Sequence, residues 1–182
     1  EVYDDELCSA SGMVGTDGGK LERARKSGTS ICGDFIMKVL EKAVKMGESN
    51  ACMKRIVAAP TAGSCGVIPA VLISMEEEFG YSEDDITKGL IAAAGIGGVI
   101  AQRAFLAGAA GGCQAEIGSA SAMAAGAAAC LRGADGQQII QAAAIALKNL
   151  LGLACDPVGG LVEVPCVKRN TIGAVGALTA AD

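Results

Sequence analysis

Three cysteines of this sequence stand in short stretches that are suited to holding iron. Cys113 follows two glycines, and Cys155 and Cys166 bound a segment that contains proline, glycine and carboxylates. A thiolate that holds an iron–sulfur cluster needs tight backbone turns, N–H donors to sulfur and room for the cluster, whereas a thiol used as a small hydrophobic side chain needs none of these. We therefore expect Cys113, Cys155 and Cys166 to be cluster ligands. Three protein ligands would leave one iron of a four-iron cluster open to act as a Lewis acid.

The eight cysteines together favour metal or redox chemistry over a disulfide framework, which belongs to smaller secreted domains. Zinc is the competing metal, but zinc sites usually show paired C-x-x-C or histidine spacing, and this sequence has neither C-x-x-C nor histidine. Cys65 could line the same site as the three predicted ligands. The remaining four are expected to be inert core or surface thiols, namely Cys8, Cys32, Cys52 and Cys130.

A second informative stretch runs from Ala59 to Gly66. Pro60 ends the segment before it, its glycines permit positive φ, and a buried helix is predicted from Val67 onward. Backbone N–H groups and hydroxyls at such a helix start suit an anion such as a substrate carboxylate. The stretch is not a phosphate-binding loop of the G-K-[ST] type. Taken alone, it favours a capped helix N-terminus without a ligand.

Composition and periodicity predict that helices position these residues. The chain is 51% hydrophobic and only 3% aromatic, and its abundant alanine and glycine favour close helix packing over a β-sandwich. We predict an all-α fold, a single compact helical domain over residues 1–182 with Gly/Pro-rich loops carrying the cluster site. Apolar spacing and caps predict helices at 20–26, 30–46, 82–107, 114–132 and 137–150, and another helix after 170. A new segment is expected to begin at 48, and a loop is expected over 152–170.

Charge excludes two classes of partner. The net charge of −5 and the absence of a basic patch argue against nucleic-acid binding. The sequence has no signal-peptide pattern at its start, and we expect a soluble, cytoplasmic protein. Charged residues interrupt the Ala/Gly-rich stretches too often for a membrane span, at Lys88, Arg103, Glu116, Arg132 and Lys148.

Three motifs, in this order, resemble the α-subunit of the iron–sulfur-dependent L-serine dehydratases, and the resemblance covers nearly the whole chain. The third motif is highly specific, because ten residues separate its two cysteines. The motifs are Pro60-Thr61-Ala62-Gly63-Ser64-Cys65-Gly66, Gly112-Cys113-Gln114-Ala115-Glu116-Ile117-Gly118, and Cys155-Asp156-Pro157-Val158-Gly159-Gly160 through Val164-Pro165-Cys166 with Arg169-Asn170.

The resemblance implies a [4Fe–4S] cluster on Cys113, Cys155 and Cys166 and β-elimination of L-serine to pyruvate and ammonia. The open iron would bind the β-hydroxyl while a base removes the α-proton, and the resulting aminoacrylate would hydrolyse through its imine tautomer. The base is expected to be a lysine of lowered pKa, with Lys42 as the choice by position and Lys38 or Lys45 as alternatives. The family segment that holds the substrate corresponds to Thr61, Ala62, Gly63 and Ser64.

The resemblance also implies a β-subunit or β-domain, from which the base could come instead, and an oligomeric enzyme. This chain is shorter than a full α-subunit, so we expect it to be part of a longer protein. Glu116, Asp156 and Glu163 are expected to be hydrogen-bond acceptors near the cluster or helix caps. Lys168 and Arg169 would offset the charge of cluster and carboxylate, or face water.

Two other functions stay open at this point. One is an L-cysteine desulfidase that uses the same cluster chemistry, and the other is a non-catalytic cluster-binding fragment that needs its β-partner. A pyridoxal-phosphate dehydratase is not expected, because the sequence lacks a catalytic lysine within an alternating β/α pattern.

Overall fold

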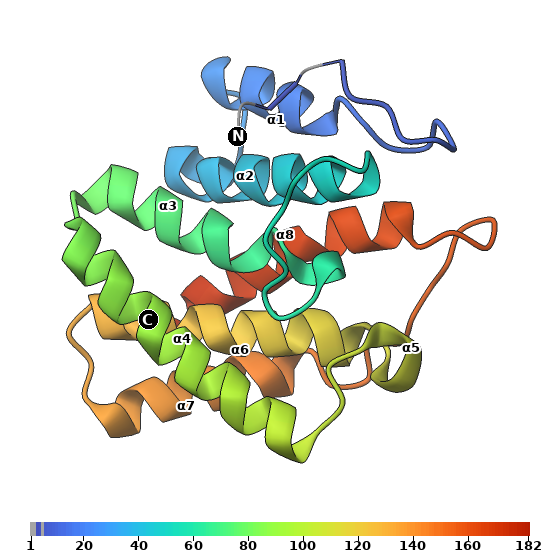
Figure 1. Ribbon diagram of the computed structural model, residues 1–182. Helices are drawn as coiled ribbons and strands as arrows, with labels where there is room; N and C mark the ends of the chain where they lie inside the picture. The colour runs from blue at the N-terminus through green and yellow to red at the C-terminus, as the bar shows by residue number, and fades with distance from the viewer. Residues whose placement is uncertain (1–2, 5) are drawn as a thin grey trace.

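The computed structural model of the chain describes residues 3–4 and 6–182, and these residues form helices without a β-sheet (Figure 1). The all-α prediction is thereby confirmed. The elements are α1 (Asp17–Lys26), α2 (Gly33–Ala51), the 3-10 turn η1 (Ala62–Ser64), α3 (Val67–Phe79), α4 (Glu83–Arg103), α5 (Gly108–Gly111), α6 (Cys113–Leu131), α7 (Gly136–Asn149) and α8 (Glu163–Ala181).

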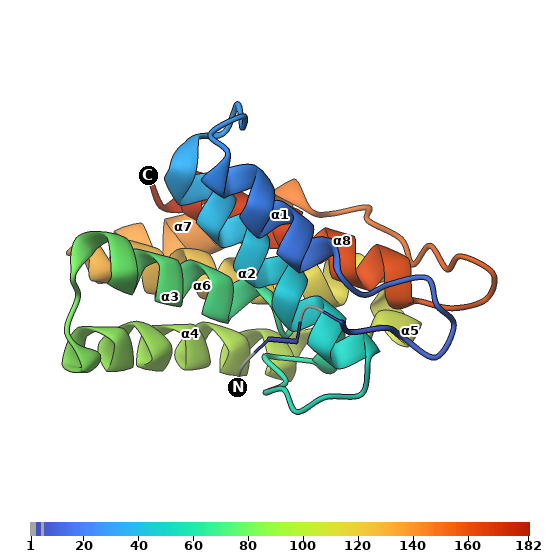
Figure 2. The same cartoon turned by 90° about the horizontal axis from the view of Figure 1, so that it is seen from above.

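Helix α6 lies at the centre of the bundle and contacts α3, α4, α7 and α8 (Figures 1 and 2). It is buried over most of its length, and alanine, glycine and serine dominate the buried side chains. Small residues on the neighbours let the backbones approach: a Cβ at Gly173 of α8 would lie 2.8 Å from Ile117, and one at Gly97 of α4 would lie 2.8 Å from Met123. In the Gly-rich middle of α4, Gly97 therefore packs closely, whereas Gly95 and Gly98 have open space beside them, and the helix continues without a break.

Helix α2 is longer than its apolar pattern predicts, because it continues through Glu48 to Ala51. The prediction that a new segment begins at 48 is wrong. Glu48 is fully buried, and its carboxylate accepts hydrogen bonds from the hydroxyl of Tyr3 and from the N–H groups of Asp17 and Gly18 at the start of α1. A buried carboxylate is tolerated when donors surround it, so α2 carries a charged residue into the interface with α1.

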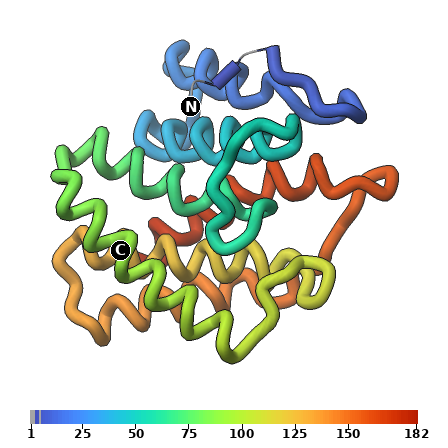
Figure 3. Tube along the Cα trace, viewed as in Figure 1, coloured from blue at the N-terminus to red at the C-terminus, as the bar shows by residue number. Residues whose placement is uncertain are grey.

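The predicted loop over 152–170 is also too long, because α8 begins at Glu163. Cys166 and Asn170 are therefore helical residues. Pro165 falls within the first turn of α8, where proline is tolerated because the N–H that it lacks would have no partner in the helix. The shorter loop before α8 passes α5 and the start of α6 (Figure 3).

Helix α4 ends at Arg103, earlier than predicted, and a four-residue helix, α5, precedes α6. No helix in the described part of the chain is both long and apolar enough to cross a lipid bilayer. The predicted division of the chain into one domain over 1–182 stays a prediction.

Candidate active site

Cys113 and the segment that ends at Cys155 lie side by side. Cys113 is the first residue of α6 and is buried, and Gly112 before it has a φ of +75°. A Cβ at Gly112 would lie 3.0 Å from the carbonyl oxygen of Leu153 and 3.4 Å from the backbone nitrogen of Cys155. The N–H of Gln114 donates to that same carbonyl at 2.8 Å. Only glycine at 112 combines this conformation with this close approach.

Arg169, on α8, joins the two segments. Its Nη1 donates to Cys113 Sγ at 2.9 Å and to the carbonyl oxygen of Ala154 at 2.8 Å, and its Nη2 lies 3.3 Å from the carboxylate of Asp156. Cys166 precedes Arg169 by three residues, so both lie on the same side of the first turns of α8. The side chain of Arg169 therefore connects the three segments that carry the predicted ligands, and the predicted surface-facing role does not apply.

The three thiols are near enough for the charge of one to affect the pKa of another. Burial, together with the charges of Cys113, Glu116 and Cys155, raises the pKa of the Cys166 thiol to about 11. Burial also raises the pKa of Cys113, although the hydrogen bond from Arg169 opposes this rise. Both groups are protonated thiols at neutral pH, so binding of a metal must release their protons.

The donor types fit an iron–sulfur cluster. As the side chains are placed, no three Cys, Asp or Glu residues of the described ranges form a group that could hold a metal ion. Three thiols nevertheless come from three segments that meet, and one of them already receives an N–H donor. Soft thiolate ligands and hydrogen bonds to sulfur are characteristic of iron–sulfur sites. Cys155 is exposed, which leaves room on its side of the group.

The predicted substrate segment forms a closed turn. The backbone N–H of Thr61 lies 3.4 Å from Ser64 Oγ, and the two hydroxyl oxygens are 3.1 Å apart. Ser64 is fully buried, and its hydroxyl also contacts the carbonyl oxygen of Ala59 at 3.4 Å. Thr61 and Ser64 therefore stabilise the turn from inside, while Ala62 and Gly63 face a cavity.

Asn170 holds this turn against the segment of Cys166. Its Nδ2 donates to the carbonyl oxygens of Gly63 at 2.8 Å and of Cys166 at 2.7 Å, and its Oδ1 accepts from the N–H of Gly66 at 2.9 Å. Asn170 is fully buried, so it needs such partners. The sequence motif includes Asn170 but assigns it no role. Its position four residues after the predicted ligand Cys166 is the feature of the sequence that could have indicated a role near the site.

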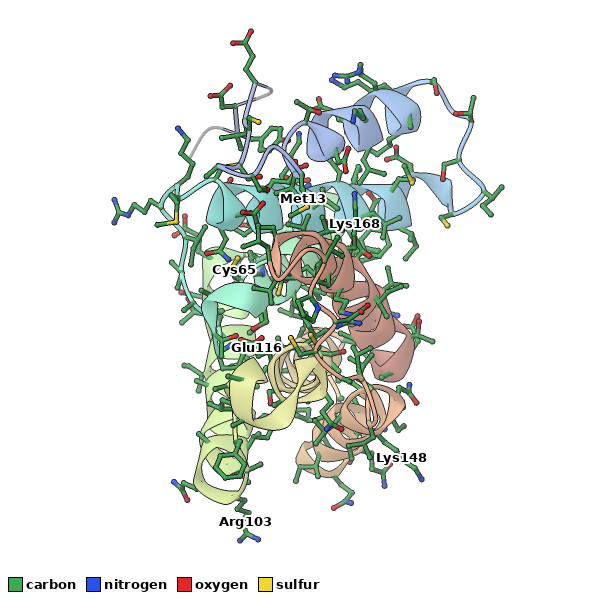
Figure 4. All side chains as sticks on the ribbon, turned by 90° about the vertical axis from the view of Figure 1, so that its right-hand side faces the viewer. Met13, Cys65, Arg103, Glu116, Lys148 and Lys168 are labelled. Carbon is green, nitrogen blue, oxygen red and sulfur yellow. The ribbon has the colours of Figure 1, made fainter. Side chains whose placement is uncertain are left out.

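The turn, Cys166 and Asn170 line one cavity of about 400 Å³ together with Glu116. Glu116 lies between the η1 turn and helix α5 (Figure 4). Cys65 does not line this cavity: it is buried beneath α2, its Sγ lies 3.6 Å from the carbonyl oxygen of Met46, and burial raises the pKa of its thiol to about 12.

The three lysines proposed as base lie on α2 in ion pairs, and none of them lines this cavity. Lys42 pairs with Glu77 of α3 at 2.7 Å, and Lys38 pairs with Glu78 of the same helix at 2.7 Å. Hydrogen bonds to carboxylates raise the pKa of Lys38, whereas a lysine base needs a lowered pKa. The assignment of the base to Lys42 stays a prediction.

The remaining predicted residues have partners around the site. Glu163 is in the first turn of α8 and accepts a hydrogen bond from Ser11 Oγ at 2.5 Å, which ties the glycine-rich N-terminal loop to α8. Lys168 forms an ion pair with Asp17 of α1.

The other four cysteines are free thiols: Cys8 and Cys32 are exposed, and Cys52 and Cys130 are partly buried.

Comparison with known proteins identifies the family. The sequence model described as "Serine dehydratase alpha chain" matches residues 2–182. The chain belongs to this family. "Probable L-serine dehydratase, alpha chain" of Bacillus subtilis is 49% identical over 97% of this chain and 59% of the relative. "L-serine dehydratase, alpha chain" of Peptoniphilus asaccharolyticus is 49% identical over 86% of this chain and 53% of the relative.

A third relative, "L-serine dehydratase" of Streptomyces coelicolor, is 48% identical over 76% of this chain but only 31% of the relative. This member of the serine dehydratase alpha-chain family thus spans a little over half the length of the first two relatives and a smaller share of the third.

Proposed function

We propose that the protein to which this chain belongs converts L-serine to pyruvate and ammonia by β-elimination. The relatives' names support this reaction, and one observation in this chain carries it: Asn170 hydrogen-bonds the predicted substrate turn at Gly63 and the predicted ligand segment at Cys166. The predicted substrate turn and one predicted ligand, Cys166, therefore line one cavity, whereas Cys113 and Cys155 are outside its lining. We further propose that the protein is cytoplasmic and oligomeric and works with a β-subunit or β-domain.

The cofactor in this proposal is a [4Fe–4S] cluster held by Cys113, Cys155 and Cys166. When bound through three thiolates, such a cluster supplies a Lewis-acidic iron that favours departure of the serine hydroxyl. Arg169 would stabilise the Cys113 thiolate through the hydrogen bond that it already donates. It would also fix the Cys155 segment through Ala154.

The chain's own residues would position the substrate. Thr61, Ala62, Gly63 and Ser64 would hold the serine, with Ser64 shaping the turn from inside and Ala62 and Gly63 forming the wall that the ligand contacts. In the reaction, a base takes the α-proton, the Cβ–O bond breaks with its electron pair on oxygen, and aminoacrylate results. The base would be Lys42 or a group of the β-portion.

Anaerobic assay of the full protein with its β-portion tests the proposal. We expect pyruvate from L-serine, and little sulfide from L-cysteine under the same conditions. Sulfide release with no serine turnover would identify a cysteine desulfidase instead. Absence of either product, with both cluster and β-portion present, would reject the enzyme function and leave a cluster-binding protein.

A further inference from the structure

Glu116 is a carboxylate inside the candidate site for which the described part of the chain offers no hydrogen-bond or ion-pair partner. It lies in the first turn of α6, is half-buried and lines the same cavity as Gly63, Cys166 and Asn170. No residue of the described ranges 3–4 and 6–182 donates a hydrogen bond to it or forms an ion pair with it. An unpaired carboxylate that has lost part of its water is costly, so a cationic ligand would stabilise this position.

The backbone is arranged around this carboxylate from two sides. A Cβ at Gly63 would lie 3.2 Å from Glu116 Oε2, and a Cβ at Gly108 would lie 2.4 Å from the same atom. Gly63 belongs to the η1 turn and Gly108 opens α5, so two separate elements reach the carboxylate with their backbones (Figure 4). The positive end of the α6 dipole would favour an acid anywhere in this turn, but it does not account for the glycines on both sides.

The charges around the cavity also favour a cation. Cys113 and Cys166, whose pKa values are raised in part by the charge of Glu116, would add negative charge as thiolates. The nearby cation, Arg169, is already directed at Cys113, Ala154 and Asp156. Among the residues that the structure describes, no side chain thus forms an ion pair with Glu116.

On the premise of the proposed function, we propose that Glu116 binds the α-ammonium group of the amino-acid substrate. A carboxylate oxygen accepts charge-assisted hydrogen bonds from an ammonium group, and these are stronger than bonds between neutral groups. Glu116 would thereby select amino acids over hydroxy acids of the same shape. It would also orient the Cα–H bond within the cavity that Gly63 and Cys166 share.

Two unreactive ligands that differ only at this group test the proposal. L-Alanine carries the α-ammonium, L-lactate carries a hydroxyl in its place, and neither has a β-hydroxyl to eliminate. Equilibrium binding of both is measured to the full protein with its β-portion, under anaerobic conditions. We expect wild type to prefer L-alanine, and Glu116→Gln to weaken L-alanine binding by about tenfold, as expected for loss of one charge-assisted bond, while L-lactate binding stays within about twofold.

Glu163→Gln is the matched control, since Glu163 lines the same cavity but already accepts a hydrogen bond from Ser11. It should keep the preference for L-alanine, and Glu116→Asp should restore part of it; thermal unfolding of each variant confirms that it is folded. Equal loss of both ligands in Glu116→Gln, an unchanged preference, or a wild type without preference would overturn the proposal. If wild type prefers L-alanine but does not turn over L-serine, the proposed function fails and the role of Glu116 stands.

Discussion

The guanidinium of Arg169 donates a hydrogen bond from Nη1 to the sulfur of Cys113 at 2.9 Å. The same nitrogen donates to the carbonyl oxygen of Ala154, so one side chain both lowers the cost of ionising Cys113 and fixes the neighbouring segment. Arg169 therefore affects both the ionisation of Cys113 and the position of the segment that leads to Cys155. Variants of Arg169 should reveal these effects in the protein without its metal.

Arg169→Met should raise the pKa of Cys113, because it removes the hydrogen bond and positive charge that oppose the effect of burial. Carbon-13 NMR of labelled cysteine follows the titration of Cys113 in the metal-free protein. Arg103→Met is the control, because Arg103 lies at the end of α4 and away from Glu116 in Figure 4. An unchanged Cys113 titration in Arg169→Met would contradict the assigned contact.

Asn170→Ala should destabilise the fold by about 2 kcal/mol or more, because it removes the buried side-chain partner of the Gly63 carbonyl oxygen and of the Gly66 N–H. Urea unfolding measures the change. Asn149→Ala, at the exposed end of α7, should cost less than about 0.5 kcal/mol. A comparable, small cost at both positions would show that Asn170 does not hold the turn to α8.

Gly112→Ala should cost more than the penalty for its positive φ alone. With its ψ of −176°, Gly112 lies in a region that is nearly exclusive to glycine, where the penalty for alanine is about 1–3 kcal/mol, and the added methyl group would also press on the carbonyl oxygen of Leu153. Gly133→Ala separates the two effects, because Gly133 has a φ of +82° but open space around it. Equal free energies of unfolding for the two variants would argue against close contact between the Cys113 and Cys155 segments.

Stability of the metal-free protein should fall as pH rises from about 9 to about 11. The folded state keeps Cys166 protonated up to its pKa of about 11, whereas the unfolded chain releases this proton near 9, so rising pH favours unfolding across that window. Cys166→Ser should reduce the fall. Urea unfolding at both ends of the window, in reductant, compares this variant with Cys130→Ser, which should retain the wild-type dependence.

The helical fold could be predicted because small and apolar residues recur at helical spacing. The bounds of α2 and α8 could not, because Glu48 is buried only through donors from α1, and Pro165 lies in a first turn that resembles a loop in sequence. Contacts between helices also escaped prediction: the pairing of Lys42 with Glu77 depends on how α2 meets α3. The order of the motifs allowed the three cysteines to be predicted as ligands. The bridging role of Asn170 could be recognised only from the structure.

Iron and acid-labile sulfide analysis after anaerobic reconstitution tests the central claim most directly. Wild type should contain about four iron and four sulfide per chain, the content of a [4Fe–4S] cluster. Serine at Cys113, Cys155 or Cys166 should each abolish most of this content, whereas Cys32→Ser should retain it, because Cys32 is exposed and outside the site. A single zinc without sulfide, or full iron and sulfide in all three variants, would contradict the claim that these thiols hold a cluster.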